Sequence, residues 1–149
     1  STKLINTIKT SSQKAVIVNI NLKDSVPIYE QLYSQIVRMA SLNILKDDEK
    51  IPSVRSLAKQ LKINPNTVQK AYTLLEKDNI IYTIKGKGSF ISSNQNASQK
   101  ELQIIKLEIN HLLSKIYNTK ITKQDVIKTV EEFYKAKEES LLKGSDFVD

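Results

Sequence analysis

The stretch IPSVRSLAKQLKINPNTVQKAYTLL, residues 51–75, holds two short helical patterns separated by a tight turn. Ser53 is a suitable N-cap for the first helix, and Asn64 followed by Pro65 is a suitable start for the second. Apolar residues then recur at three- and four-residue steps, at Val54, Leu57, Ala58 and Leu61 in the first pattern and at Val68, Ala71, Tyr72 and Leu75 in the second. Each predicted helix is too short to be stable alone, so the two must share a core.

A longer helix is predicted before this pair. It should begin near Ser25, with Pro27 in its opening turn, and continue to about Leu42. Its apolar face consists of Tyr29, Leu32, Tyr33, Ile36, Met39 and Ala40. The polar residues 46–50 are typical of a loop. The longer helix therefore offers an apolar face to the core of the short pair.

A β-hairpin is predicted after the short pair. Asn79 can adopt the left-handed conformation that ends a helix, and residues 80–84 are rich in strand formers. Residues 85–88, Lys-Gly-Lys-Gly, make a turn, after which residues 89–91 return. A helix, two short helices with a tight turn and a basic hairpin together indicate a winged helix-turn-helix over residues 23–93.

The C-terminal third, residues 94–149, is predicted to be a helical hairpin that dimerises. Residues 94–97 look like a linker, and Ser98 with Glu101 fits a capping box. Apolar residues then alternate steps of three and four, which allows one helix to pack along another, at Leu102, Ile105, Ile109, Leu112 and Ile116. Such a seam requires a partner helix.

A second helix is predicted in this hairpin. Thr122 and Asp125 can form its capping pair, and Gly144 suits its end. Its apolar face carries Val126, Val130, Phe133 and Ala136. We assign Val130 and Phe133 to the dimer interface together with the seam. The expected fold class is mainly α with a small β-hairpin, a winged helix-turn-helix followed by a short helical dimerisation hairpin.

The net charge of +7 is unevenly distributed along the chain. Residues 1–22 carry three Lys and no acid, residues 23–93 carry eleven basic and seven acidic residues, and residues 94–149 carry nine of each, giving +3, +4 and zero. This distribution favours a polyanionic partner for the N-terminal two-thirds. Residues 1–22 themselves are expected to be a basic, flexible lead-in, with a candidate edge strand in 16–22 whose partner is not visible.

The composition excludes several kinds of chemistry. The chain has no Cys and a single His, His111, so disulfides, thiolate metal sites and His-based triads are not expected. No apolar run approaches the roughly 20 residues that cross a bilayer. We therefore expect a cytoplasmic protein that has no cofactor or metal and is not an enzyme.

The start of the second short helix carries the candidate DNA-reading residues. Asn66, Thr67 and Gln69 could reach base edges in a major groove, while Lys70 could pair with phosphate. Arg55 offers a planar fork for guanine or phosphate, although a surface salt bridge with the acidic loop is an alternative. Glycine and lysine at the hairpin tip suit a wing near the duplex. The predicted DNA-contacting set is Ser53, Arg55, Asn64, Asn66, Thr67, Gln69, Lys70, Lys85, Gly86 and Lys87.

Four motifs now make the sequence recognisable. PIYEQL at 27–32, IPSVRSLA at 51–58, NPNTVQKAY at 64–72 and GKGSFI at 86–91 closely resemble the GntR family of bacterial transcription regulators. The resemblance implies that Arg55 reads the operator, that Asn66, Thr67 and Gln69 lie in the recognition segment, and that Lys85 and Gly86 belong to the wing. Asn43 and Asn79 stand where relatives commonly have glycine, and asparagine tolerates the left-handed backbone needed there.

The number of residues after the wing indicates which subfamily the chain resembles. About 56 residues are too few for the large effector or aminotransferase domains of most relatives, and two amphipathic helices instead resemble the YtrA subfamily. That likeness implies a homodimeric repressor of a palindromic operator that controls a neighbouring transporter operon.

Two alternatives remain open at this point. A small-molecule sensor would hold an unknown effector near Tyr117, Phe133 and Tyr134 or at the dimer interface, although such aromatics are more often plain core. An interaction module would use the helical tail without DNA. An effector that alters DNA affinity would support the first, and activity without residues 27–91 would support the second.

Overall fold

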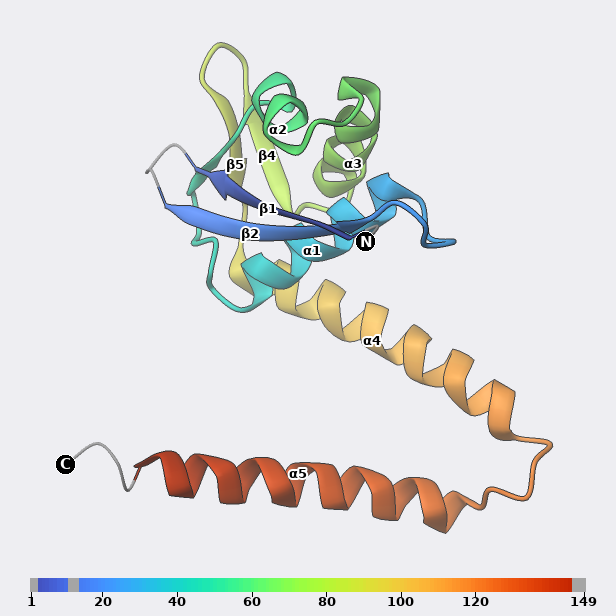
Figure 1. The fold of residues 1–149 in the computed structure, drawn as a ribbon. Helices are drawn as coiled ribbons and strands as arrows, with labels where there is room; N and C mark the ends of the chain where they lie inside the picture. The colour runs from blue at the N-terminus through green and yellow to red at the C-terminus, as the bar shows by residue number, and fades with distance from the viewer. Residues whose placement is uncertain (1–2, 11–13, 146–149) are drawn as a thin grey trace. The chain divides into compact units, whose positions relative to one another are not determined.

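The computed structural model describes residues 3–10 and 14–145 (Figure 1). The chain divides into two compact units, Ser1–Ile105 and Lys106–Asp149. The division falls inside a single helix, α4 (Asn94–Ile116), so it does not coincide with a loop. None of the described helices is long and apolar enough to cross a membrane.

Three helices build the centre of the first unit. α1 (Ile28–Ser41) is followed by α2 (Val54–Leu61) and α3 (Pro65–Lys77), which match the predicted long helix and short pair. α1 begins at Ile28 rather than near Ser25, because Pro27 is its N-cap. The predicted caps of the short helices are confirmed. Ser53 Oγ accepts a hydrogen bond from the backbone N–H of Ser56 at 3.1 Å, and Asn64 Oδ1 accepts one from Asn66 at 2.8 Å.

The predicted apolar stripes meet in one core. Leu32, Leu57 and Leu75 are each at most 1% exposed, and they come from α1, α2 and α3 respectively. Tyr72 is also buried, and its hydroxyl donates a hydrogen bond to the carbonyl oxygen of Pro52 at 2.5 Å. The short pair is therefore held by a core shared between α1, α2 and α3 rather than by helix propensity.

A three-stranded sheet completes the winged helix-turn-helix. The predicted hairpin is present as β4 (Ile81–Ile84) and β5 (Gly88–Ile91), which pair antiparallel. A short strand that the sequence did not reveal, β3 (Lys50–Ile51), joins the other edge of β5. Asn43 and Asn79 have φ values of 59° and 58°, which confirms the left-handed backbone expected at both.

The N-terminal segment differs from expectation. The candidate strand in 16–22 exists as β2 (Ala15–Asn21), and its partner is β1 (Lys3–Lys9), which we had expected to be flexible lead-in without regular structure. Local sequence missed β1 because its stability depends on partners outside it. β1 contacts α2 and β2 contacts α1, so the hairpin packs on the winged helix-turn-helix.

Two glutamine side chains of α1 form hydrogen bonds with the backbone of β2. Gln31 accepts a hydrogen bond from the N–H of Asn21 at 2.8 Å and donates one to the carbonyl oxygen of Asn21 at 2.9 Å. One turn later, Gln35 makes the same pair of bonds with Asn19. The two amides satisfy backbone groups at the free edge of β2, as a neighbouring strand would.

The helical C-terminal third is confirmed, but its start is corrected. Residues 94–97 are not a linker, because α4 begins at Asn94, where Ser93 Oγ accepts hydrogen bonds from the N–H groups of Gln95 and Asn96. Asn94 itself donates to the carbonyl oxygens of Ala40 and Leu45. These tertiary bonds start the helix one turn before the predicted Ser98 cap.

The last helix, α5 (Lys123–Ser145), begins as predicted. The N–H of Thr122 donates to Asp125 Oδ2 at 2.8 Å, and the N–H of Asp125 donates to Thr122 Oγ1 at 3.1 Å. The backbone N–H of Thr122, with a smaller contribution from the Thr122 side chain, holds the pKa of the Asp125 carboxyl below its usual range, because both stabilise the charged form of the carboxyl. The capping pair therefore fixes where α5 starts.

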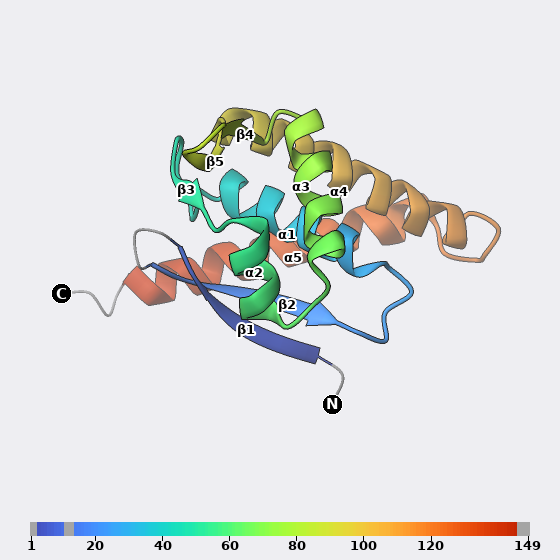
Figure 2. The same cartoon turned by 90° about the horizontal axis from the view of Figure 1, so that it is seen from above.

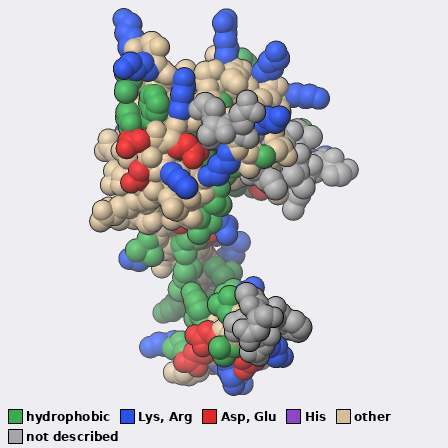
Figure 3. Space-filling view, turned by 90° about the vertical axis from the view of Figure 1, so that its left-hand side faces the viewer, with side chains coloured by type: hydrophobic (Ala, Val, Ile, Leu, Met, Phe, Trp, Pro, Cys, Tyr) green, Lys and Arg blue, Asp and Glu red, His purple; other side chains and the backbone are tan. Residues whose placement is uncertain are grey.

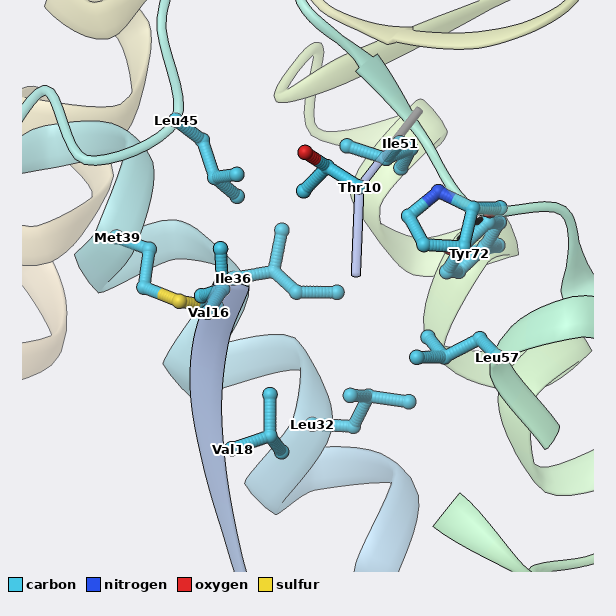
Figure 4. Close-up of a pocket in the computed structure, with 11 residues that line it drawn as sticks. Thr10, Val16, Val18, Leu32, Ile36, Met39, Leu45, Ile51, Leu57 and Tyr72 are labelled. Carbon is cyan, nitrogen blue, oxygen red and sulfur yellow. Dashed lines mark hydrogen bonds between the residues drawn. The ribbon is translucent and has the colours of Figure 1, made fainter. Parts of the chain in front are cut away.

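A small cavity lies between the β1–β2 hairpin and helices α1, α2 and α3 (Figure 4). Its volume is about 30 Å³, and its lining includes Val16 and Val18 of β2, Leu32 and Ile36 of α1, and Tyr72 of α3. Ligand sites usually span roughly 300–1,000 Å³. This cavity is too small for an organic effector.

The raised pKa values of two tyrosines are expected to make the stability of the fold depend on pH. Burial raises the pKa of Tyr72 well above the usual value, and burial together with the hydrogen bond to Asp78 raises the pKa of Tyr33. An unfolded tyrosine ionises near pH 10. The folded state holds the hydroxyl protons of these two tyrosines more tightly than the unfolded state does. Their contribution to the free energy of unfolding is therefore complete below about pH 10 and is lost as pH rises towards the folded pKa values. We expect denaturant midpoints to fall between about pH 8 and about pH 11, with a smaller fall in Tyr72→Phe; an identical fall in that variant would contradict this account.

Candidate nucleic-acid interface

α3 has one buried face and one polar face. Its buried residues are Val68, Ala71, Tyr72 and Leu75. On the opposite side, Asn66, Gln69 and Thr73 are exposed at steps of three and four residues, which places them in one line along the helix. Thr67 is half-buried. The predicted outward presentation of Asn66 and Gln69 therefore agrees with the structure, while Thr67 is less accessible than we expected.

The neighbouring elements flank α3 on both sides. Viewed from above (Figure 2), α2 and α3 lie between the β4–β5 hairpin and the β1–β2 hairpin, in agreement with the contacts of α3 with β4 and of α2 with β1. The tip of the β4–β5 hairpin projects past α2 and α3 at the top of Figure 1. α2, α3 and the tip of the β4–β5 hairpin thus lie at one end of the first unit.

Ser53 and Asn64 act first as caps in this structure. Each side-chain oxygen accepts a hydrogen bond from the first turn of the helix it precedes. A capped, rigid first turn holds the residues just behind it in a fixed direction. Ser53 and Asn64 are both exposed, so any DNA contact they make would come in addition to capping.

Arg55 is exposed in the first turn of α2. That turn contains no acidic residue. Of the three ion pairs found among residues 3–10 and 14–145, none involves Arg55, so the alternative of a salt bridge with the acidic loop receives no support there. Its guanidinium remains available for an external anion.

Gln69 is held by a residue that sequence reasoning missed. Gln69 Nε2 donates a hydrogen bond to Thr73 Oγ1 at 3.3 Å, and the Thr73 hydroxyl donates to the backbone carbonyl oxygen of Gln69 at 2.9 Å. The signal was present in the sequence as a Gln–Thr pair at i, i+4 on a polar helix face.

Lys70 contacts an aromatic ring in this structure. Its Nζ lies 4.0 Å from the centroid of the Tyr29 ring, a cation–π arrangement. Tyr29 had been assigned simply to the apolar face of the first helix, and it is only half-buried. The predicted phosphate contact by Lys70 would require its ammonium to leave this ring or to bind phosphate from beside it.

The wing tip is built as predicted. Lys85, Gly86 and Lys87 are all exposed, and the N–H of Lys87 closes the turn by donating to the carbonyl oxygen of Ile84 at 2.9 Å. Gly86 has a φ of 79°, and apart from its two chain neighbours no residue has an atom within 4 Å of where a Cβ would be. Glycine is favoured there by its backbone conformation, and its open surroundings allow close approach of another molecule.

Positive side chains gather at the same end of the unit. In Figure 3 several Lys and Arg side chains project from the top of the molecule, where the wing tip lies in Figure 1. The polar face of α3, Arg55 and the wing lysines thus combine shape with positive charge. A helix and a flexible basic loop presented together suit the groove and phosphates of a duplex.

The predicted dimerisation residues are largely exposed. On α4, Leu102, Ile109 and Leu112 are 54%, 50% and 59% exposed, and on α5, Val130 and Phe133 are 50% and 58% exposed. Ile105 is 38% exposed and Ile116 is half-buried. Such a set of apolar side chains is unusual on a surface that contacts only water.

A hollow lies where α4 meets α5. Its volume is about 510 Å³, and its lining includes Ile116, Tyr117, Ile121 and Val126. Phe133 and Tyr134 do not line it, although their rings contact each other edge to face. The three aromatics of the expected sensor site are therefore not brought together around one cavity.

No candidate metal site is found in the part of the chain that the structure describes, since no three His, Asp or Glu residues cluster there.

Comparison with known sequences identifies relatives. The sequence model described as "Bacterial regulatory proteins, gntR family" matches residues 28–91. The HTH-type transcriptional repressor YtrA of Bacillus subtilis is 40% identical over 98 residues, which cover 64% of this chain and 75% of that protein. The HTH-type transcriptional regulator YhcF of the same species is 29% identical over 112 residues, covering 74% and 93% of the two chains.

Solved structures show the same architecture. A GntR family transcriptional regulator from Listeria monocytogenes superposes with a TM-score of 0.65 at 32% identity, covering 74% of this chain and 98% of that one. YtrA from Sulfolobus acidocaldarius gives a TM-score of 0.52 at 30% identity, with 64% and 99% covered.

Proposed function

Because the chain belongs to the gntR family of bacterial regulatory proteins, we propose that this DNA-binding transcription regulator is a repressor that binds a palindromic operator as a homodimer. In this proposal the polar face of α3 enters the major groove, Arg55 contacts the operator from α2, and Lys85, Gly86 and Lys87 contact the backbone from the wing. Transcription is blocked because the bound dimer excludes polymerase. This function places the protein in the cytoplasm.

The observation that carries the DNA-binding geometry is the exposed, capped face of α3. Asn66 and Gln69 extend from a helix whose first turn is fixed by Asn64 and whose opposite face is buried. Reading bases requires such rigidity, because a mobile side chain loses entropy on binding. The positive charge at this end adds sequence-independent attraction to phosphate.

The dimer is supported by the exposed apolar residues of α4. Leu102, Ile109 and Leu112 recur at the spacing of a helix seam, and each is at least 50% exposed in a single chain. Pairing two chains about a twofold axis would bury this seam and set two recognition helices against the two halves of a palindrome. Repression is supported by the likeness to the YtrA repressor. The YtrA-like architecture also leads us to propose a neighbouring transporter operon as the target.

Titration of the DNA upstream of the protein's own operon, repeated across salt concentrations, tests this function. We expect specific binding that weakens steeply with salt, because several phosphates release counterions when bound. Binding of equal strength to unrelated DNA of the same length would contradict operator recognition.

Replacing Arg55 with alanine should weaken specific operator binding by about 1–3 kcal/mol, because a bidentate contact is lost. Arg38→Ala is the matched control, since Arg38 is the other arginine of the chain and is exposed in the last turn of α1. Fluorescence anisotropy with a labelled operator measures both. Equal affinities of Arg55→Ala and Arg38→Ala would remove Arg55 from the interface.

A regulator gated by a small molecule is the second candidate function. The hollow at the junction of α4 and α5 has a volume in the range of ligand sites, and its lining is mainly apolar. A candidate effector is identified by calorimetry, and it must change operator affinity. Ile121→Trp, which would fill the hollow, should then abolish the effector's influence but leave operator binding intact.

A further inference from the structure

The direction of the hydrogen bonds between Gln69 and Thr73 can be decided from their partners. The Thr73 hydroxyl has one hydrogen, and it goes to the backbone carbonyl oxygen of Gln69, 2.9 Å away, because a carbonyl cannot donate. Towards the Gln69 side chain, Thr73 Oγ1 can then only accept. The group facing it at 3.3 Å is therefore the amide NH2 of Gln69 and not the amide oxygen.

This arrangement leaves a defined set of groups on Gln69. One N–H of the amide is bound to Thr73, so the second N–H and Oε1 are left for a base. In the major groove adenine presents one acceptor, N7, and one donor, the N6 amino group. Guanine presents two acceptors, N7 and O6, and a bidentate contact to it requires two donors.

We propose that Thr73 fixes the Gln69 amide so that Gln69 reads adenine and rejects guanine at one position of each operator half-site. This specificity rests on the proposed function, in which α3 enters the major groove. Thr73 is a positioning residue, because it acts on the base through Gln69.

The placement of the pair on α3 supports this role. Asn66, Gln69 and Thr73 are exposed along one side of the helix, and Val68 and Tyr72 between them are buried. The helix cannot turn about its axis without exposing that core. The packed core therefore fixes the direction of the Gln69 side chain, and the hydrogen bond to Thr73 fixes the orientation of its amide.

The experiment first locates the base pair. Selection from randomised DNA with the wild-type protein and with Gln69→Ala identifies the operator position whose adenine preference depends on Gln69. Operators with A·T or G·C at that position are then titrated with the wild type, Thr73→Val and Thr73→Ser. Thr73→Val keeps the shape but removes the hydroxyl, whereas Thr73→Ser keeps the hydroxyl. Because residue 73 is exposed, both variants should fold, and thermal melting checks this.

We expect the wild type to prefer adenine over guanine by about fivefold or more, the size of a bidentate base contact. Thr73→Val should bring this ratio close to one, because the freed amide can present both hydrogens to guanine. Thr73→Ser should restore the ratio. Replacing the adenine with 7-deazaadenine, which lacks N7, should remove the preference in the wild type.

Three results would overturn the inference. They are an unchanged adenine preference in Thr73→Val, no position that depends on Gln69, and wild-type affinity that does not change with 7-deazaadenine. In all three, specific operator binding by the wild type would leave the proposed function standing. Failure of the wild type to select any sequence would instead contradict the proposed function itself.

Discussion

Replacing Leu112 with aspartate should separate the proposed dimer into monomers and lower the affinity for a palindromic operator by a factor of about 10² to 10⁴. Leu112 is 59% exposed in the single chain, so its replacement costs the folded monomer little. In a dimer the same side chain would lie in the helix seam, where an unpaired carboxylate is strongly unfavourable. Loss of pairing removes the gain that comes from holding two recognition helices on one DNA molecule.

Leu107→Asp is the matched control for this prediction. Leu107 belongs to the same helix, is 70% exposed and lies outside the three-and-four seam. Sedimentation equilibrium measures the mass of each variant, and titration with one or two half-sites measures affinity. Leu112→Asp should bind one and two half-sites almost equally, while Leu107→Asp should behave like the wild type. A dimeric Leu112→Asp variant with full operator affinity would contradict the proposal that the α4 seam forms the dimer interface.

Replacing Leu75 with alanine should lower the free energy of unfolding by about 2–5 kcal/mol. Leu75 lies on the buried face of α3, with no exposed surface, and belongs to the core shared with α1 and α2. Removing its branched end leaves a cavity beneath α3, and the surrounding side chains cannot fill it completely. Denaturant unfolding followed by circular dichroism should show a lower midpoint with an unchanged slope.

Leu42→Ala provides the comparison, because Leu42 is 59% exposed just after α1. A surface substitution of this kind usually changes stability by less than about 0.5 kcal/mol. Equal losses in Leu75→Ala and Leu42→Ala would mean that α3 is not held by the core described above.

Several elements were predictable because their causes are local. Ser53, Asn64 and Thr122 cap helices where the sequence placed them, since capping uses groups within a few residues. Asn79 ends α3 in a left-handed conformation for the same reason. The polar face of α3 followed from helical periodicity alone.

Other elements depend on distant partners. β1 was missed because its backbone pairs with β2 and its last residue, Lys9, is bound by Gln60 of α2 at 2.9 Å. α4 starts early because Asn94 binds carbonyl groups of Ala40 and Leu45, about 50 residues away. Local propensity contains no trace of such bonds.

The sequence by itself determined the winged helix-turn-helix, its caps, and the outward direction of Asn66 and Gln69, because periodicity and capping act over one or two helical turns. Tertiary structure alone decided that the N-terminal hairpin packs on α1 and α2 and that the Lys70 ammonium lies over Tyr29. These contacts join segments far apart in the chain, and their free energy depends on burial and geometry that exist only after the core has formed.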